Sequence, residues 1–183
     1  MNDSGKQPAL LNPYAENLYN FALDREDIKW LLQGLPQDGQ VDLNTVEYEL
    51  QLLKIVSTGW AISFYLQEDP LKDQIQEPYW QAMREFSENI SQTTSLLIGK
   101  DIEYFKILKS RLETYVQAMA ALEPDNDPTQ AIGPAFAYCC GDRDNPFTTL
   151  AGAKLFANTL SSVREYLIKA VGEDEGSCNV TVQ

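Results

Sequence analysis

Apolar residues recur at intervals of three and four along four long stretches of this chain, and this spacing constrains the fold more than any other feature. Such spacing places the apolar residues on one face of an α-helix. The clearest run contains Phe105, Leu108, Leu112, Tyr115, Met119 and Leu122. No apolar run of any length alternates with a period of two, which is the pattern of a half-buried strand. The pattern therefore predicts an all-α fold.

The stripes, together with residues that start and stop helices, give the expected boundaries. Four long helices are expected over about 44–66, 70–98, 101–122 and 146–171, and shorter ones over about 13–23, 25–33 and 129–140. The expected N-caps are Asn12, Asn44 or Thr45, Asp101 and Asn145. We expect a helical bundle in which the helix over 44–66, apolar on more than one face, is central.

Two residues inside these helices interrupt the regular pattern. Gly59 costs about 1 kcal/mol relative to Ala in a helix interior, so its presence predicts close helix packing or a bend. Pro78 lacks a backbone N–H, and we expect it to kink or split its helix.

The length of the chain, 183 residues, fits one domain with a core large enough to need no metal or disulfide. We expect residues 13–171 to form this domain after a flexible N-terminus over 1–12. The last residues, GEDEGSCNVTVQ, are acidic and contain few apolar side chains. Residues 172–183 are therefore expected to form an acidic disordered tail.

An excess of acidic residues sets the electrostatic character of the chain: 27 Asp and Glu against 14 Lys and Arg give a net charge of −13. Such a charge repels phosphate backbones and anionic membrane surfaces, so neither nucleic acid nor a membrane is an expected partner. The longest apolar stretch, residues 55–66, is too short to span a bilayer. The first residues lack the pattern of a signal peptide. Together these features predict a cytoplasmic protein.

The sequence contains no histidine, and this absence excludes several kinds of chemistry. It removes imidazole general bases, the Glu-x-x-His ligands of di-iron bundles and zinc bound by histidine. Three cysteines cannot complete a four-thiolate zinc site, and no glycine-rich phosphate loop occurs. We therefore expect no catalytic residues, no metal site and no cofactor.

One pair of acids is the remaining candidate for enzymatic chemistry. Glu85 and Glu88 lie three residues apart and share a helix face, as paired Mg²⁺ ligands must. The next helix offers no second pair, because the segments 103–106 (EYFK) and 113–116 (ETYV) each contain a single Glu. A solvated acidic face is the expected interpretation, and a magnesium-dependent enzyme is a remote alternative.

The stretch AFAYCCGDRDNP, residues 135–146, contains the adjacent cysteines Cys139 and Cys140 and, close by, Arg143. At the C-terminal end of a helix the dipole disfavours a thiolate. We expect a helix to stop here, with Gly141 in the left-handed conformation and Pro146 in the first turn of the next helix. A metal or redox role for the thiols, and a ligand or partner contact, are the alternatives.

Two aromatic patches and two polar segments have more than one interpretation. Trp30, Trp60 and Trp80 are expected mainly in the core, with a helix-lined pocket as the alternative. Trp80 lies a quarter-turn from its helix's apolar stripe, so we expect it at a rim or a partner contact. The basic residues between 100 and 111 are expected to form a solvated face with neighbouring acids, and the polar segment 87–95 faces either a cavity or water.

These observations predict a non-enzymatic α-helical protein that acts as a protein–protein interaction or adaptor module. The partner is expected to be another protein or a second copy of the chain in a homodimer. The residues singled out for ligand or partner contact are Trp60, Trp80, Cys139, Cys140 and Arg143. The alternative is a small-molecule-binding helical bundle with an aromatic-lined pocket beside Trp60.

Overall fold

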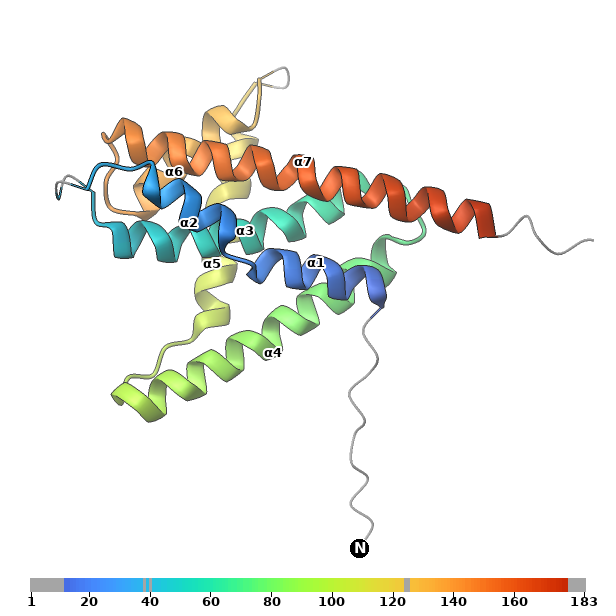
Figure 1. Ribbon diagram of the computed structural model, residues 1–183, viewed down its shortest axis with the longest axis horizontal. Helices are drawn as coiled ribbons and strands as arrows, with labels where there is room; N and C mark the ends of the chain where they lie inside the picture. The colour runs from blue at the N-terminus through green and yellow to red at the C-terminus, as the bar shows by residue number, and fades with distance from the viewer. Residues whose placement is uncertain (1–11, 38, 40, 124–125, 178–183) are drawn as a thin grey trace, which may run out of the picture.

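The computed structural model describes residues 12–37, 39, 41–123 and 126–177, which form seven α-helices and, within these ranges, no strand (Figure 1). The helices are α1 (Pro13–Leu23), α2 (Glu26–Gln33), α3 (Leu43–Tyr65), α4 (Lys72–Ile98), α5 (Tyr104–Ala120), α6 (Thr129–Cys139) and α7 (Pro146–Ser177). The all-α prediction is confirmed, and most helix ends lie close to those expected.

The end of α7 is the main difference. The helix continues to Ser177, so residues 172–177 are helical and not part of a disordered tail. The net charge of the last turns had suggested disorder, but these residues extend an existing helix, which costs far less than starting one. The expectations for residues 1–11 and 178–183 lie outside the described part of the chain. No helix in that part is both long and apolar enough to cross a membrane.

Helix α3 is the centre of the fold. Its buried apolar residues point to all sides of the helix: Val46, Leu50, Leu52, Leu53, Ile55, Val56, Ala61 and Ile62. Helix α7 lies alongside α3, and the other five helices also contact it (Figure 1). Helix α5 runs across α3 and α7 in this view, so the long helices do not all lie side by side.

A charged side chain is buried within α3. Lys54 exposes 1% of its surface, and its ammonium group donates to the backbone carbonyl of Asp24 and to the carboxylate of Asp27, each at 2.8 Å. Asp24 ends α1 and Asp27 lies in the first turn of α2. The buried charge is thus paired and hydrogen-bonded, as its desolvation requires, and it holds the junction between α1 and α2 against α3.

Two glycines allow α6 and α7 to pack closely. A Cβ on Gly152 of α7 would lie 2.5 Å from ring atoms of Phe136, which is fully buried. A Cβ on Gly133 of α6 would lie 2.9 Å from the backbone carbonyl oxygen of Thr149. A side chain at either position would force the two helices apart.

Helices α3 and α4 also meet at a glycine. A Cβ on Gly59 would lie 2.2 Å from the ring of Trp80, which fills the space over this part of α3. The close packing predicted at Gly59 is confirmed. Helix α4 runs without a break from Lys72 to Ile98 with Pro78 inside it, so the proline does not split the helix.

Local hydrogen bonds show which capping predictions hold. Asn12 accepts from the N–H of Tyr14 at 2.9 Å, and Asn145 accepts from the N–H of Phe147 at 3.0 Å, as expected. Gly141 has the left-handed φ of 74° that ends α6.

Two predicted caps are wrong. The N-cap of α3 is Asp42 and not Asn44 or Thr45. The Asp42 carboxylate accepts hydrogen bonds from the N–H groups of Asn44 and Thr45. Asp101 does not cap α5, which begins three residues later; it accepts a hydrogen bond from the Ser95 hydroxyl at 2.8 Å.

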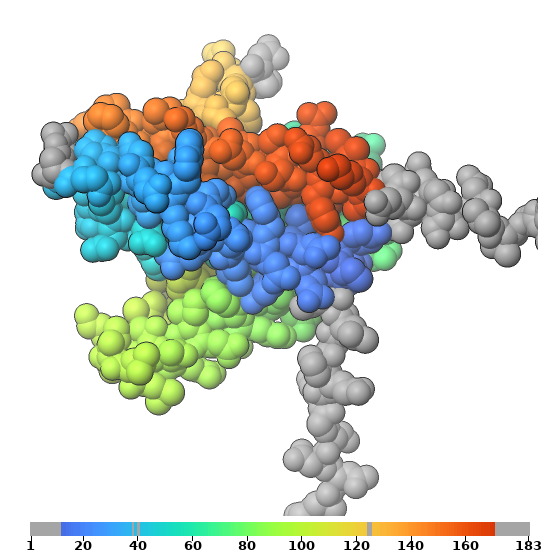
Figure 2. Space-filling model, viewed as in Figure 1, coloured from blue at the N-terminus to red at the C-terminus, as the bar shows by residue number. Residues whose placement is uncertain are grey.

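The last turns of α4 and the connection to α5 stand away from the rest of the molecule, whereas Tyr104 and Leu108 of α5 are buried against it. We call residues 84–109 the α4–α5 lobe. Figure 2 shows the C-terminal half of α4 as a separate projection below the body. The preceding part of α4 packs against α1 and α3, with Tyr79 and Met83 fully buried. The core therefore covers only part of the length of α4.

Candidate functional site

The two adjacent cysteines lie at the C-terminal end of α6. Cys139 is the last residue of the helix and Cys140 is its C-cap. The N–H of Gly141 donates to the carbonyl of Tyr138, and the N–H of Asp142 donates to the carbonyl of Ala137, which is the Schellman arrangement of a helix end. Both thiols are free and half-buried. The helix-stop interpretation of this stretch is confirmed.

A buried ion pair lies beside the thiols. Arg111 of α5 donates from Nε and one terminal nitrogen to the two carboxylate oxygens of Glu49 of α3, at 2.7 and 2.6 Å. The side chain of Glu49 is 4% exposed and that of Arg111 is 24% exposed. Hydrogen bonding to this carboxylate raises the pKa of the guanidinium, which therefore keeps its positive charge.

The surroundings keep both thiols protonated. Burial raises the pKa of Cys139, and Arg111 opposes this shift only in part. Burial, with the negative charges of Glu49 and Asp142, raises the pKa of Cys140 well above its ordinary range. A nucleophilic or metal-binding cysteine needs the thiolate form. The arrangement therefore supports a packing role for the thiols and does not favour a reactive one.

The buried hydroxyl of Tyr115 completes this cluster. It faces the Cys139 thiol and has no nitrogen or oxygen partner in the described part of the chain. Burial raises the pKa of Tyr115 well above its usual value. The phenol therefore stays neutral beside two neutral thiols, with the Glu49–Arg111 pair and Asp142 as neighbouring charged groups.

Arg143 does not act on the thiols. Its guanidinium carbon lies 3.9 Å from the centre of the Tyr138 ring, in a cation–π contact. The cation beside the thiols is Arg111, which the sequence analysis had assigned to a solvated basic face. Its carboxylate partner lies 62 residues earlier in the chain, and no local pattern indicates such a pairing.

The two tryptophans singled out from the sequence pack in different places: Trp60 of α3 lies against Phe156 of α7, with ring centres 6.0 Å apart, and Trp80 of α4 lies against α3. Trp60 stacks on Phe64 with ring centres 4.7 Å apart and an interplanar angle of 13°. Trp80 covers Gly59 and is half-buried. Neither lines the two pockets described below. Their rings pack against α3 and its neighbours and are not grouped with Cys139, Cys140 or Arg143.

The acids of α4 have ordinary surface partners. Glu85 accepts from the side chain of Gln81, and Glu88 pairs with Arg84 at 3.0 Å. Within the described residues no group of three or more His, Cys, Asp or Glu side chains converges as metal ligands would. The carboxylate pair is thus an element of the α4–α5 lobe surface.

The lobe contains a groove of about 780 Å³ between α4 and α5. Small hydroxyl residues of α4 line its floor. The Ser91 hydroxyl accepts from the N–H of Tyr104 at 3.1 Å, and the Ser95 hydroxyl donates to Asp101. Ser91 and Ser95 of the polar segment 87–95 therefore tie α4 to the connection and start of α5, while residues 88, 89, 92 and 93 face water.

An aromatic ring with two cations forms one wall of this groove. Phe105 lies under the ammonium group of Lys109, 5.0 Å from the ring centre, and under the guanidinium of Arg84 at 6.0 Å. Arg84 is held by Glu88, and Lys106 pairs with Glu103 at 3.1 Å. The wall is apolar at its centre and charged at its edge, which is the composition of a protein-binding surface.

Three consecutive aliphatic residues are exposed at the tip of the lobe. Leu96, Leu97 and Ile98 expose 87%, 78% and 61% of their surfaces. Leu96 also lines the groove. Gly99 follows with a left-handed φ of 65° and ends α4, so these side chains lie on the last turn of the helix.

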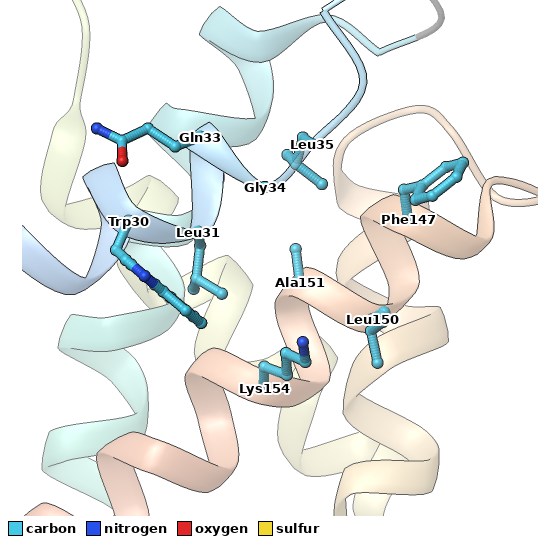
Figure 3. A pocket seen from close by; sticks show the side chains of 9 residues that line it. All are labelled: Trp30, Leu31, Gln33, Gly34, Leu35, Phe147, Leu150, Ala151 and Lys154. Atoms are coloured by element: carbon cyan, nitrogen blue, oxygen red, sulfur yellow. The ribbon is translucent and has the colours of Figure 1, made fainter.

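A second, smaller pocket of about 330 Å³ lies between α2 and the start of α7. Figure 3 shows Trp30 and Leu31 of α2 facing Ala151 and Lys154 of α7 across it. Trp30 is 64% exposed, the most exposed of the tryptophan side chains. Trp30 is one of the three tryptophans for which a pocket between helices was the alternative to a core position, and it lines one.

Comparisons of the chain with models of known protein families, with curated proteins and with solved structures find no match. The geometry of the described residues is therefore the basis for a functional hypothesis.

Proposed function

We propose that this protein is a non-enzymatic interaction module that binds an apolar surface of another polypeptide through the α4–α5 lobe. The observation that carries the proposal is the exposed aliphatic tip, Leu96, Leu97 and Ile98. Single exposed apolar residues are common on soluble proteins, but a contiguous group is characteristic of interaction surfaces.

The apolar stripe of α4 supports this proposal, because it is longer than the body that covers it. Tyr79 and Met83 are fully buried and Phe86 and Ile90 are half-buried, yet Leu97, on the same face, is 78% exposed. A stripe at helical spacing normally lies against a partner along its whole length. The uncovered part is thus where a partner helix is expected to pack.

The groove beside the tip suits a polypeptide partner. Its centre is apolar around Phe105 and its edge carries paired charges, which matches the apolar core and polar rim of protein interfaces. We give less weight to a small-molecule site beside Trp60, because the ring of Trp80 fills the neighbouring space over Gly59. Enzymatic use of the thiols has less support, since both are held in the protonated form.

Site-specific photocrosslinking in cells of the native host tests this proposal. A benzophenone amino acid at position 97 should give discrete crosslinked products, whereas the same group at position 168 should not. Ile168 of α7 is a matched control, being 62% exposed, like Ile98 at 61%. The proposal fails if position 97 gives no product beyond that of position 168 while the protein remains folded by circular dichroism.

A further inference from the structure

The α4–α5 lobe differs in charge from the rest of the molecule. Residues 84–109 contain four bases and four acids, so the lobe is neutral although the chain has a net charge of −13. The whole acidic excess therefore lies outside the lobe. Two copies that meet through a surface of net negative charge bring like charges together, which opposes association. The neutral lobe imposes no such repulsion on two copies.

The charges of the lobe also divide into a paired and an unpaired set. Arg84 pairs with Glu88, and Lys106 pairs with Glu103. The other four, Glu85, Lys100, Asp101 and Lys109, have no ion-pair partner among the described residues. The unpaired set thus contains two charges of each sign.

Such a balanced set suits a contact between identical surfaces. In a two-fold symmetric interface the same patch supplies both sides, so it must carry groups that complement one another. A basic or an acidic foreign partner would need a patch of one sign. A basic partner would in addition be drawn to the acidic body of the protein and not to the neutral lobe.

We propose that the polypeptide bound by the lobe is a second copy of this chain, joined lobe to lobe about a two-fold axis. This inference rests on the proposed function. Helices α4 and α5 of the two copies then form an intermolecular four-helix arrangement. Leu96, Leu97 and Ile98 of each copy pack against the apolar wall around Phe105 of the other. The uncovered part of the α4 stripe becomes the centre of the interface, where energetically dominant contacts are found.

Sedimentation equilibrium of the full chain, from low micromolar to several hundred micromolar protein, tests this arrangement. The wild-type protein should pass from its monomer mass of 20.6 kDa to twice that value. Leu97→Asp should raise the dimer dissociation constant by about tenfold or more. Ile168→Asp, at a comparably exposed site on α7, should leave it unchanged. Circular dichroism and the melting temperature show whether each variant is folded.

Two outcomes overturn the inference: a wild-type monomer at the highest concentration, and a dimer that Leu97→Asp leaves intact. In the second case Trp30→Asp is also measured, and loss of the dimer in that variant would place the interface at the α2–α7 pocket. The photocrosslinking experiment separates this inference from the proposed function. A strict monomer that crosslinks to a different protein at position 97 refutes only the second copy. No product of either kind at position 97 refutes both.

Discussion

Removing Arg111 alone from the buried Glu49–Arg111 pair should destabilise the protein more than removing both residues. Arg111→Met leaves the Glu49 carboxylate, 4% exposed, without either of its two hydrogen bonds. An uncompensated buried charge of this kind costs about 3–5 kcal/mol. Glu49→Met should cost less, about 1–3 kcal/mol, because the guanidinium is 24% exposed and can turn toward water.

The double variant Glu49→Met, Arg111→Met removes both charges and keeps the volume nearly constant. Replacing a buried ion pair by apolar residues is often close to neutral, so the double variant should be more stable than Arg111→Met alone. Urea unfolding followed by circular dichroism gives the free energies of unfolding of the wild type, the two single variants and the double variant. The comparison holds when all four proteins unfold with the same denaturant slope. The reasoning is refuted if Arg111→Met costs less than about 1 kcal/mol, or if the two single costs simply add in the double variant.

Three further variants test the packing and titration described above. Gly152→Ala places a methyl group against the Phe136 ring, and the overpacking cost of about 1–3 kcal/mol should exceed the gain of about 1 kcal/mol in helix propensity, so the melting temperature falls. Lys54→Met removes both hydrogen bonds of the ammonium group at the α1–α2 junction and should cost about 2–3 kcal/mol in urea unfolding; a neutral result would contradict the role assigned to this group. The raised pKa values of Cys139 and Cys140 predict stability that is present below the unfolded thiol pKa of about 8.5 and is lost as pH rises above it. Replacing both thiols by Ala should reduce this alkaline loss, measured by urea unfolding between about pH 7 and pH 10, and an unchanged pH dependence would count against it.

Sequence patterns predicted the features that depend on residues close together in the chain. The apolar stripes placed seven helices, because helix periodicity is set within a few turns. Asn145 and Gly141 were predicted for the same reason, since each cap is made with neighbours two to four residues away. The cap of α3 was missed because Asp42, Asn44 and Thr45 are all good capping residues, and only the path of the preceding chain decides among them.

Features that depend on distant segments were not predictable. Arg111 has acids nearby in sequence, yet its partner is Glu49 on another helix. The apolar spacing of α4 indicated correctly which face of the helix is apolar, but it gave no information on what covers that face. Leu97 fits the core pattern as well as Met83 does, and the two differ because the body of the protein ends between them.

The projection of the α4–α5 lobe has a consequence for local motion. Amide protons in the buried middle of α3, residues 49–62, should exchange with solvent only when the whole molecule unfolds. Those of the last turns of α4, around Leu97, lie beside exposed side chains and should exchange through opening of that end alone. The lobe thus forms a region of low local stability attached to a rigid body, and an added partner would slow exchange there before it changed exchange anywhere else.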